Sequence, residues 1–399
     1  MKTNIITIGG AIRDITFLTN KGRVIETPRN LTERALLGFE YGAKIKSQEV
    51  YFNFGGGACN TAATFSKLGL KTAVCSRVGN DTDGEFITSN LKKRKISPDL
   101  IQLDKQKRTG FSLVVVNKNS EKTSLCPLLA KRGENSVAEK GERVIFVYKG
   151  ANDDLKINSR KILSKKPDWF YVTSLAGEWE KSLNDIFKLT KKNKIKIAIN
   201  PGADQIKGGL KKLSNILAVT EILILNRDEA IELVGSKAGN KKLSGAKLNN
   251  IKFLVSELLK AGSRVVVITD GEKGAYAGKN PSLTPPKREI KNSPLERGRG
   301  CVSQEEKTHP CPSQEGNYKV LFSPASADER VDATGAGDAF GSAFVGGYIL
   351  NNGDLEKSLK FGIINSGGVV GEYGAQNGIL GRREIKGRMG KLDIISLVP

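Results

Sequence analysis

The sequence has few of the residues that mark secreted, membrane-spanning or metal-binding proteins. Only five of its 399 residues are cysteine and one is histidine. An odd number of irregularly spaced cysteines argues against a disulfide framework and favours a reducing compartment. No apolar run approaches the roughly 20 residues that cross a bilayer, and no basic and apolar leader precedes the first strand pattern. We therefore expect a cytoplasmic protein.

Acidic residues are in the minority. The chain has 64 lysines and arginines against 42 aspartates and glutamates, which gives a net charge of +22. Such an excess can indicate a nucleic acid, an acidic membrane surface or an anionic substrate as partner. The lysines, however, are spread in short pairs such as Lys92-Lys93, and no basic helix is interleaved with aromatic residues. This spread indicates a solvated surface, so we expect neither nucleic acid nor a membrane as partner.

Aromatic residues are also scarce, at 6%, whereas glycine is frequent, with 44 residues. This mix is typical of an α/β protein with many tight turns between strands and helices. Short apolar runs alternate with helical periodicity along much of the chain, which predicts right-handed crossovers. The predicted fold is a doubly wound, mainly parallel sheet with helices on both faces. Its predicted strands are residues 5–8, 72–78, 169–173, 196–200, 222–225 and 265–269.

A smaller sheet is predicted outside this core. Residues alternate between apolar and polar at 12–25, 50–54 and 111–116, which favours a small antiparallel sheet that acts as a lid. We assign the lid to segments 12–54 and 108–128 of a main domain that spans residues 1–380. Residues 381–399 are assigned to a C-terminal tail.

Residues 279–317 interrupt the regular pattern. They contain six of the 13 prolines, the single histidine and two of the five cysteines, with little apolar periodicity. We interpret them as a flexible surface insertion. Cys301, His309 and Cys311 supply only three candidate ligands where structural zinc takes four, so a metal site is not expected there.

The strongest chemical signal is the run Thr334-Gly335-Ala336-Gly337-Asp338. Its small residues let the backbone approach a ligand, and an apolar helical stretch begins at Asp338, so free N–H groups would face an anion. An aspartate placed there can accept the proton of an attacking hydroxyl, while Gly335, Ala336 and Gly337 stabilise charge on a transferred phosphoryl group. The alternative is an ordinary glycine turn with Asp338 as a helix cap.

Two segments together resemble the signatures of the ribokinase-like (PfkB) family of carbohydrate and nucleoside kinases. They are the Asp-x-Thr-Gly-Ala-Gly-Asp run at residues 332–338 and the glycine-rich segment at residues 55–60, which ends in Asn60. The resemblance covers about residues 4–380. It implies an ATP-dependent kinase that phosphorylates a hydroxyl of a sugar or nucleoside, with Asp338 as general base and an anion hole at Gly335–Gly337. A catalytically silent sugar-binding or regulatory protein on the same fold is the alternative.

The resemblance also implies the positions of the ligands. Acceptor hydroxyls are expected at Asp14, Gly56, Gly57 and Asn60, and Mg²⁺ is expected near Asn226 and Glu229. A monovalent cation such as K⁺ is expected at Asp332 beside the carbonyl of Thr334. The lid is expected to close over the acceptor and to form a homodimer. The residues expected on the nucleotide side are Asn200, Thr269, Gly271, Lys273, Gly274, Thr334 and Gly337.

Several of these residues have simpler local explanations. Asn226 and Glu229 have the spacing of a helix capping box. Asp270 and Gly271 form a dipeptide that is typical of a hairpin turn. Asp14 alone would be an ordinary turn residue.

Overall fold

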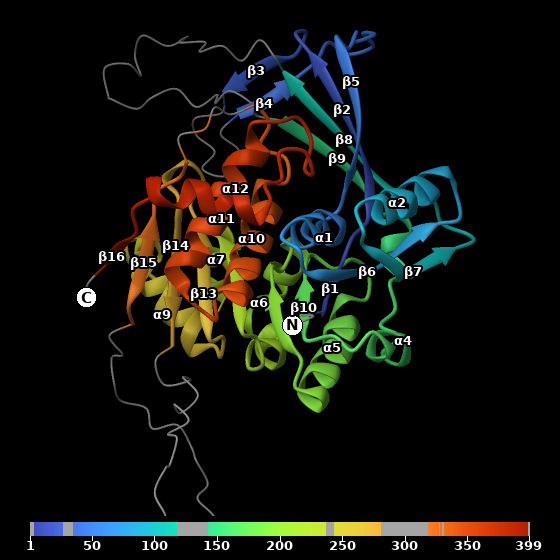
Figure 1. The fold of residues 1–399 in the computed structure, drawn as a ribbon. Coiled ribbons are helices and arrows are strands. Elements are labelled where there is room, and N and C mark those ends of the chain that lie inside the picture. Colours follow the sequence, from blue (N-terminus) through green and yellow to red (C-terminus); the bar gives the residue numbers. More distant parts are fainter. Residues whose placement is uncertain are drawn as a thin grey trace, which may run out of the picture.

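The centre of the protein is a large, mostly parallel β-sheet (Figure 1). The computed structural model describes residues 4–26, 35–117, 143–236, 243–280, 318–326, 328 and 331–397. Within them the main sheet has ten strands in the order β16-β15-β14-β13-β12-β11-β10-β1-β6-β7. The strands from β13 to β7 in that order run parallel, whereas β14, β15 and β16 pair antiparallel. The bounds are β1 Asn4–Ile8, β6 Lys71–Gly79, β7 Ser97–Asp104, β10 Trp169–Val172, β11 Lys196–Ile199, β12 Ile222–Asn226, β13 Val265–Thr269, β14 Ala275–Lys279, β15 Val320–Ser323 and β16 Ile395–Leu397.

Helices cover both faces of this sheet, as the sequence predicted. Because successive side chains of a strand point to opposite faces, Ile222 and Ile224 pack on one side of β12 while Leu223 and Leu225 pack on the other. The first side holds α1 (Gly57–Lys67), α10 (Ala336–Leu350) and α11 (Leu355–Val370). The second holds α5 (Trp179–Asn193), α6 (Ala203–Leu217), α7 (Arg227–Gly235) and α9 (Ile251–Lys260). The remaining helices are α2 Thr82–Lys93, α4 Ser159–Ser164, α8 Gly245–Asn249, α12 Arg382–Arg388 and the 3₁₀ turns η1 Gly150–Asp154, η3 Gly271–Lys273 and η5 Met389–Lys391.

The order of the strands reverses next to β1. From β1 the chain moves outward to β6 and β7, and it then returns to β10 on the other side of β1 before it continues to β13. In open α/β sheets, ligands bind beyond the carboxyl ends of the strands at such a switch point. The topology therefore favours a site at the end of β1 and β10.

The lid is a four-stranded sheet in the order β5-β2-β8-β9. Its strands are β2 (Ile12–Thr19), β5 (Glu49–Gly55), β8 (Gly110–Asn117) and β9 (Arg143–Tyr148). The expectation of an antiparallel sheet is wrong in one place, because β2 and β8 pair in parallel. Both strands follow parallel strands of the main sheet, β1 and β7, and therefore leave it in the same direction. The end of the 12–25 run forms instead a separate pair of strands, β3 (Arg23–Glu26) with β4 (Ala35–Gly38).

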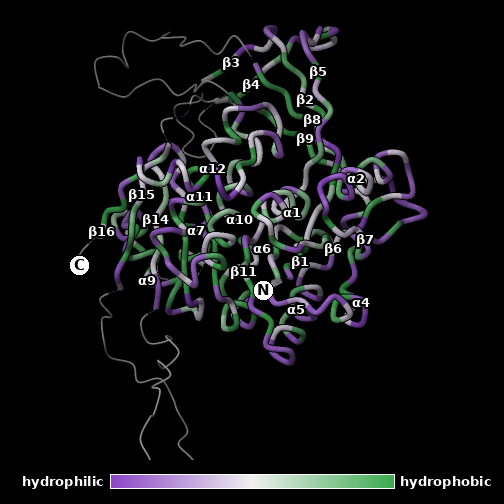
Figure 2. Tube along the Cα trace, viewed as in Figure 1, coloured by the Kyte–Doolittle hydropathy of each residue, from purple (hydrophilic) through white to green (hydrophobic). Residues whose placement is uncertain are grey.

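The two faces of the lid differ in character. Asp14 lies opposite Asn53 of β5 and Ser112 of β8, so these polar side chains share one face. The neighbouring row, on the opposite face, consists of Phe52, Ile15, Leu113 and Phe146. Phe52 is 61% exposed and Phe146 59% exposed. The lid strands, like those of the main sheet, carry many hydrophobic residues (green in Figure 2).

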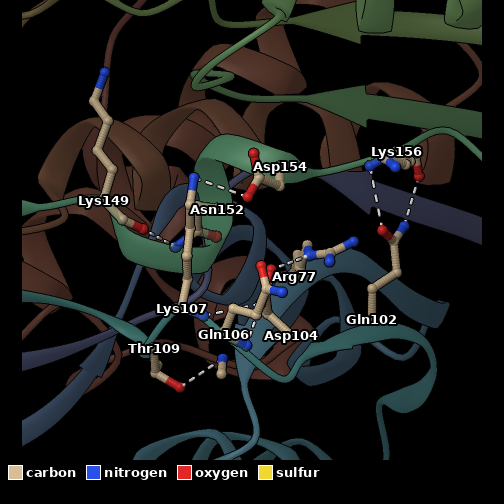
Figure 3. A network of polar contacts seen from close by, with 11 residues as sticks. Arg77, Gln102, Asp104, Gln106, Lys107, Thr109, Lys149, Asn152, Asp154 and Lys156 are labelled. Carbon is tan, nitrogen blue, oxygen red and sulfur yellow. Dashed lines mark hydrogen bonds and ion pairs between the residues drawn. The ribbon is translucent and has the colours of Figure 1, made fainter.

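A polar network fixes the connection from the main sheet to the lid (Figure 3). The Asp104 carboxylate at the end of β7 accepts the backbone N–H groups of Gln106 (2.8 Å) and Lys107 (2.9 Å). It also accepts a hydrogen bond from Nε of Arg77 at 2.9 Å. The Lys107 side chain forms an ion pair with Asp154 at 2.8 Å. These contacts set the path by which the chain enters β8.

Some segments assigned from the sequence lie outside the described residues. They include residues 281–317 of the predicted insertion, residues 27–34 and 118–128 of the predicted lid segments and residues 398–399 of the predicted tail. The strands that flank the insertion, β14 and β15, pair directly with each other. The predicted tail contains α12 and β16, and β16 extends the main sheet by pairing with β15. Among the described helices, none has the length and apolar character that crossing a membrane requires.

Candidate active site

Asp338 lies in the first turn of α10, beside the switch point. Helix α10 begins at Ala336, two residues before the predicted start. Its cap, Gly335, has a φ of 78°, and a Cβ atom there would lie 2.4 Å from the Cβ of Ala375. Only glycine meets both conditions without strain. The first backbone N–H groups of a helix have no acceptor within it, so this end of α10 can receive an anion.

The residues of the predicted anion hole differ in how accessible they are to a bound anion. The N–H of Ala336 points to the carbonyl of Ala333 at 3.3 Å. Gly337 is exposed, and no heavy atom lies within 4 Å of the position that a Cβ would take. The space beside Gly337 thus leaves room for a phosphate group at this helix end.

Asp332 holds the loop that precedes α10. Its carboxylate is buried and accepts hydrogen bonds from the N–H (2.8 Å) and hydroxyl (2.6 Å) of Thr334. Its second oxygen accepts the N–H of Gly374 at 3.0 Å. Both oxygens of Asp332 are therefore used to fasten the Thr334 loop against the segment that follows α11.

Asp338 contacts the second motif directly. The Asn60 side chain of α1 donates from Nδ2 to Oδ2 of Asp338 at 2.9 Å. Burial raises the pKa of Asp338 above its ordinary value, and the hydrogen bond from Asn60 partly opposes this shift. A carboxylate with a raised pKa accepts a proton near neutral pH more readily than an exposed aspartate does. Asn60 was expected to bind the acceptor, and the structure shows that it also contacts Asp338, the predicted base.

Asp14 faces this group from the lid. Its carboxylate is only 6% exposed and accepts the Ser112 hydroxyl at 2.6 Å. A Cβ on Gly55 would lie 1.9 Å from Oδ2 of Asp14, so glycine is needed there to make room for the carboxylate. Burial raises the pKa of Asp14 to about 6, the Ser112 hydrogen bond opposes the shift, and the charges of Asp338 and Asp332 add to it. Asp14 is therefore electrostatically coupled to both aspartates of the glycine loop.

The glycine-rich segment begins α1 at the same place. The N–H of Ala58 donates to the carbonyl of Gly10, just after β1, at 3.1 Å. Gly56 caps α1 and Gly57 is its first residue. The structure therefore brings Asp14, Gly56, Gly57 and Asn60 together with the Thr334–Asp338 loop at the switch point.

A second group of predicted residues lies along the carboxyl ends of β11, β12 and β13. Asn226 and Thr269 are register partners at the ends of β12 and β13. Asn200, which follows β11, donates from Nδ2 to the carbonyl of Ile224 at 3.0 Å. Parallel strands end at the same edge of a sheet, so this group shares an edge with the first group.

Asn226 and Glu229 form the capping box that was the simpler local explanation. Asn226 accepts the N–H of Glu229, and Glu229 accepts the N–H of Asn226, both at 2.8 Å. Burial raises the pKa of Glu229, partly opposed by its hydrogen bond from Asn226. Among the described residues, no group of three or more His, Cys, Asp or Glu side chains could hold a metal ion. A bound Mg²⁺ would thus depend on phosphate and water oxygens, which is its usual preference.

The segment from Asp270 to Gly274 is a hairpin connection between β13 and β14, as the second local explanation held. Asp270 accepts Nη1 of Arg227 at 2.8 Å, which ties the turn to the start of α7. No heavy atom lies within 4 Å of the Cβ position of Gly271, and Lys273 is exposed. The turn therefore presents an open backbone and one lysine at the carboxyl edge of the sheet.

Three residues of this site were not predicted from the sequence. Ser112 binds Asp14, Gln376 donates to Oδ1 of Asn60 at 3.0 Å, and Asn53 places a buried Nδ2 that lacks a hydrogen-bond partner beside Gly374. Ser112 and Asn53 share the lid face of Asp14, so strand alternation was the signal that could have found them. Gln376 gave no comparable signal, because the chain separates it from Asn60 by 316 positions.

Comparisons with known proteins agree with this fold. A curated relative from Archaeoglobus fulgidus, described as an uncharacterized sugar kinase, is 23% identical over 320 residues, which are 79% of this chain and 97% of the relative. The solved nucleoside kinase of Methanocaldococcus jannaschii matches with a TM-score of 0.62 at 19% identity, covering 97% of this chain and 98% of its own. Arabidopsis thaliana ribokinase, solved with ribose and ATP, matches with a TM-score of 0.64 at 17% identity, covering 98% and 99%.

The family comparison covers most of the chain. Residues 27–292 and 311–380 match the pfkB family carbohydrate kinases, and the interruption at 293–310 falls within the predicted insertion. The fold, the two signatures and the family match thus lead to one conclusion: this chain belongs to the pfkB family of carbohydrate kinases.

Proposed function

We propose that this kinase transfers the γ-phosphoryl group of ATP to a hydroxyl of a sugar or nucleoside, with Asp338 as general base. The observation that carries the proposal is the position of Asp338. It lies in the first turn of α10, it is hydrogen-bonded to Asn60, and burial raises its pKa. A base in this position can accept a proton beside N–H groups that stabilise a phosphoryl group.

Asp338 takes the proton of the acceptor hydroxyl as the hydroxyl oxygen bonds to the γ-phosphorus. The bond from that phosphorus to the oxygen bridging the β-phosphate breaks, and ADP leaves. The backbone N–H groups of Gly335, Ala336 and Gly337 stabilise charge on the group in transfer. Asp332 contributes by holding the Thr334 loop in place through its three hydrogen bonds.

Asp14 holds the acceptor. A carboxylate can accept hydrogen bonds from two neighbouring hydroxyls, and its bonds to them are charge-assisted. Asp14 lies on the inner face of the lid, and its carboxylate takes one hydroxyl hydrogen bond, from Ser112. Asn53 adds a buried amide nitrogen on the same face, directly opposite Asp14 across the strands. Gly56 and Gly57 border the acceptor at the start of α1.

The nucleotide lies across the ends of β11, β12 and β13. Asn200, Thr269, Gly271, Lys273 and Gly274 border it, and the open space at Gly271 and Gly337 fits phosphate groups. Mg²⁺ neutralises charge on the phosphates when bound. Glu229 uses Oε2 for the helix cap, and its Oε1 would hold a water of a bound Mg²⁺. A monovalent cation such as K⁺ would contact the carbonyl of Thr334.

A catalytically silent protein on the same fold is less well supported. A partly buried, ionisable carboxylate at a helix start costs free energy, and a silent protein would gain no activity in return. Here Asp338, Asn60 and the open glycine loop are all present together.

The test is Asp338→Asn, assayed for ADP release with ATP, Mg²⁺ and a panel of sugars and nucleosides. We expect kcat to fall roughly 10²–10⁴-fold while fold and nucleotide binding are kept. Asp185→Asn is the matched control, because Asp185 is a surface residue of α5 that pairs only loosely with Lys188, at 3.8 Å. Near-normal turnover of Asp338→Asn would refute the assignment of the base.

A further inference from the structure

The side-chain amide of Asn60 lies between two partners. Its Nδ2 donates to Oδ2 of Asp338 at 2.9 Å, and its Oδ1 accepts from Nε2 of Gln376 at 3.0 Å. Asn60 is 6% exposed and Gln376 is 7% exposed, so water does not readily replace either contact. An amide carries donors at one end and an acceptor at the other. A partner bound at one end of the amide therefore fixes whether the other end presents donors or an acceptor.

The direction of this amide matters for Asp338. A carboxylate is stabilised when Asn60 turns its NH₂ group toward it, and destabilised when Asn60 turns its oxygen toward it. The NH₂ group of Gln376 can only donate, so it holds the oxygen of Asn60 away from Asp338. The direction of Gln376 is supported in turn by Nδ2 of Asn90 on α2, which lies 3.4 Å from Oε1 of Gln376.

We propose that Gln376 is a positioning residue of this kinase, which fixes the orientation of the Asn60 amide and so keeps its N–H directed at Asp338. The inference rests on the proposed function, in which Asp338 is the base. Gln376 does not touch the acceptor or the phosphates in this role. It acts through Asn60 alone.

The other groups near Asp338 would not change its pKa when Gln376 is replaced. Asp14 from the lid and Tyr171 from β10 are the titratable groups that interact with its charge. From α11, Asn365 and Ser366 bind the carbonyls of Ala339 and Ala336 and do not titrate. All of these groups stay unchanged when Gln376 is replaced. In a variant that adds no charge, a change in the titration of Asp338 would thus report on Asn60.

Gln376→Glu tests the proposal most directly. The glutamate has the same length but can only accept a hydrogen bond from Asn60 when ionised. We expect the Asn60 amide to turn, to present its oxygen to Asp338, and to raise the pKa of Asp338 by about one to two units. The acid limb of the kcat profile should move up by the same amount.

Two further variants separate orientation from charge and from folding. Gln376→Met removes the donor without adding charge, and we expect a rise of less than about one unit because Asn60 is then free to adopt both directions. Asn377→Asp adds the same charge one residue along, at an exposed side chain that binds the carbonyl of Tyr373. We expect it to leave the titration of Asp338 within about 0.3 units of the unmodified protein.

The measurement is a ¹³C NMR titration of the full chain labelled at aspartate carboxyl carbons, without substrate. The Asp338 signal is identified by its loss in Asp338→Asn. A rise in both Gln376→Glu and the uncharged Gln376→Met supports the proposal, because the charge of the glutamate alone also raises the pKa of Asp338. An unchanged titration in Gln376→Met overturns it, whether or not Gln376→Glu folds. Because this readout needs no turnover, it is independent of whether Asp338→Asn abolishes activity, which tests the proposed base separately.

Discussion

Replacing Asp14 with asparagine should make the protein more stable at neutral pH. Folding moves the Asp14 carboxyl from water to a buried position where a single side chain, Ser112, donates to it, and its pKa rises from 3.8 to about 6. The folded state therefore holds this proton more tightly than the unfolded state does. It follows that the free energy of unfolding falls as the pH rises from about 4 through about 6, and the loss is complete above that window.

The size of the effect follows from the shift. The difference between 3.8 and about 6 corresponds to about 3 kcal/mol of unfolding free energy at neutral pH. Asparagine keeps an oxygen that can accept from Ser112. It also brings an NH₂ group into buried surroundings beside Gly55, and an unpaired donor there costs about 1 kcal/mol. We expect a net gain of about 2 kcal/mol at pH 7.5 and none at pH 4.

Urea unfolding of both proteins at the two pH values, without ligands, measures this gain. The matched control is Asp104→Asn, because backbone hydrogen bonds from Lys107 and Gln106, and then Arg77, lower the pKa of Asp104 to about 2 (Figure 3). Its carboxylate stabilises the fold above pH 3.8, and this contribution is lost as the pH falls through about 2. Asp104→Asn should therefore destabilise the protein at pH 7.5. The reasoning is refuted if Asp14→Asn gains nothing at pH 7.5 or gains equally at pH 4.

Two further predictions concern the periphery. Deleting Pro281 to Gly316 should leave folding and kinase activity largely intact, because β14 and β15 pair directly and the family match is interrupted at 293–310; loss of soluble protein would contradict this. We also propose that the exposed apolar face of the lid, which includes Phe52 and Phe146, packs against the same face of a second copy. Phe52→Lys should then shift sedimentation at micromolar concentration from dimer to monomer. The control Leu103→Lys should not, because Leu103 is similarly exposed but lies on β7 of the main sheet. If the unmodified protein already sediments as a monomer, the dimer is refuted.

The sequence predicted the main sheet well because its strands are buried on both sides. The predicted strand 222–225 corresponds to β12, and the predicted strand 265–269 corresponds to β13. The edge strands were missed for a physical reason. Strand β7 is only partly buried along Ser97–Asp104, and β16 is largely exposed, so neither has a continuous apolar run. Pairing between distant segments, such as β2 with β8, is decided by topology and leaves no trace in local alternation.

Contacts between distant residues of the site were likewise not predictable from local sequence. Local pattern indicated a phosphate-binding helix start at Asp338, and resemblance supplied Asn60, but neither indicated that the two side chains touch. They are 278 positions apart in the chain, and their contact depends on how α1 packs against α10. The capping box at Asn226 and Glu229 was visible in the sequence because both residues lie within one turn of α7.

The three aspartates of the site differ most in how many donors surround them. Asp332 accepts three hydrogen bonds from the protein, so its oxygens are committed to holding the Thr334 loop. Asp14 accepts one from Ser112, and Asp338 accepts one from Asn60. Burial raises the pKa of the latter two, because one donor does not replace the lost water. A carboxylate with few donors has spare capacity to bind hydroxyls or take up a proton, whereas the three donors around Asp332 leave it little capacity for a further ligand. The distribution of donors therefore supports Asp332 as the anchor of the loop, Asp14 as the ligand of the acceptor and Asp338 as the base.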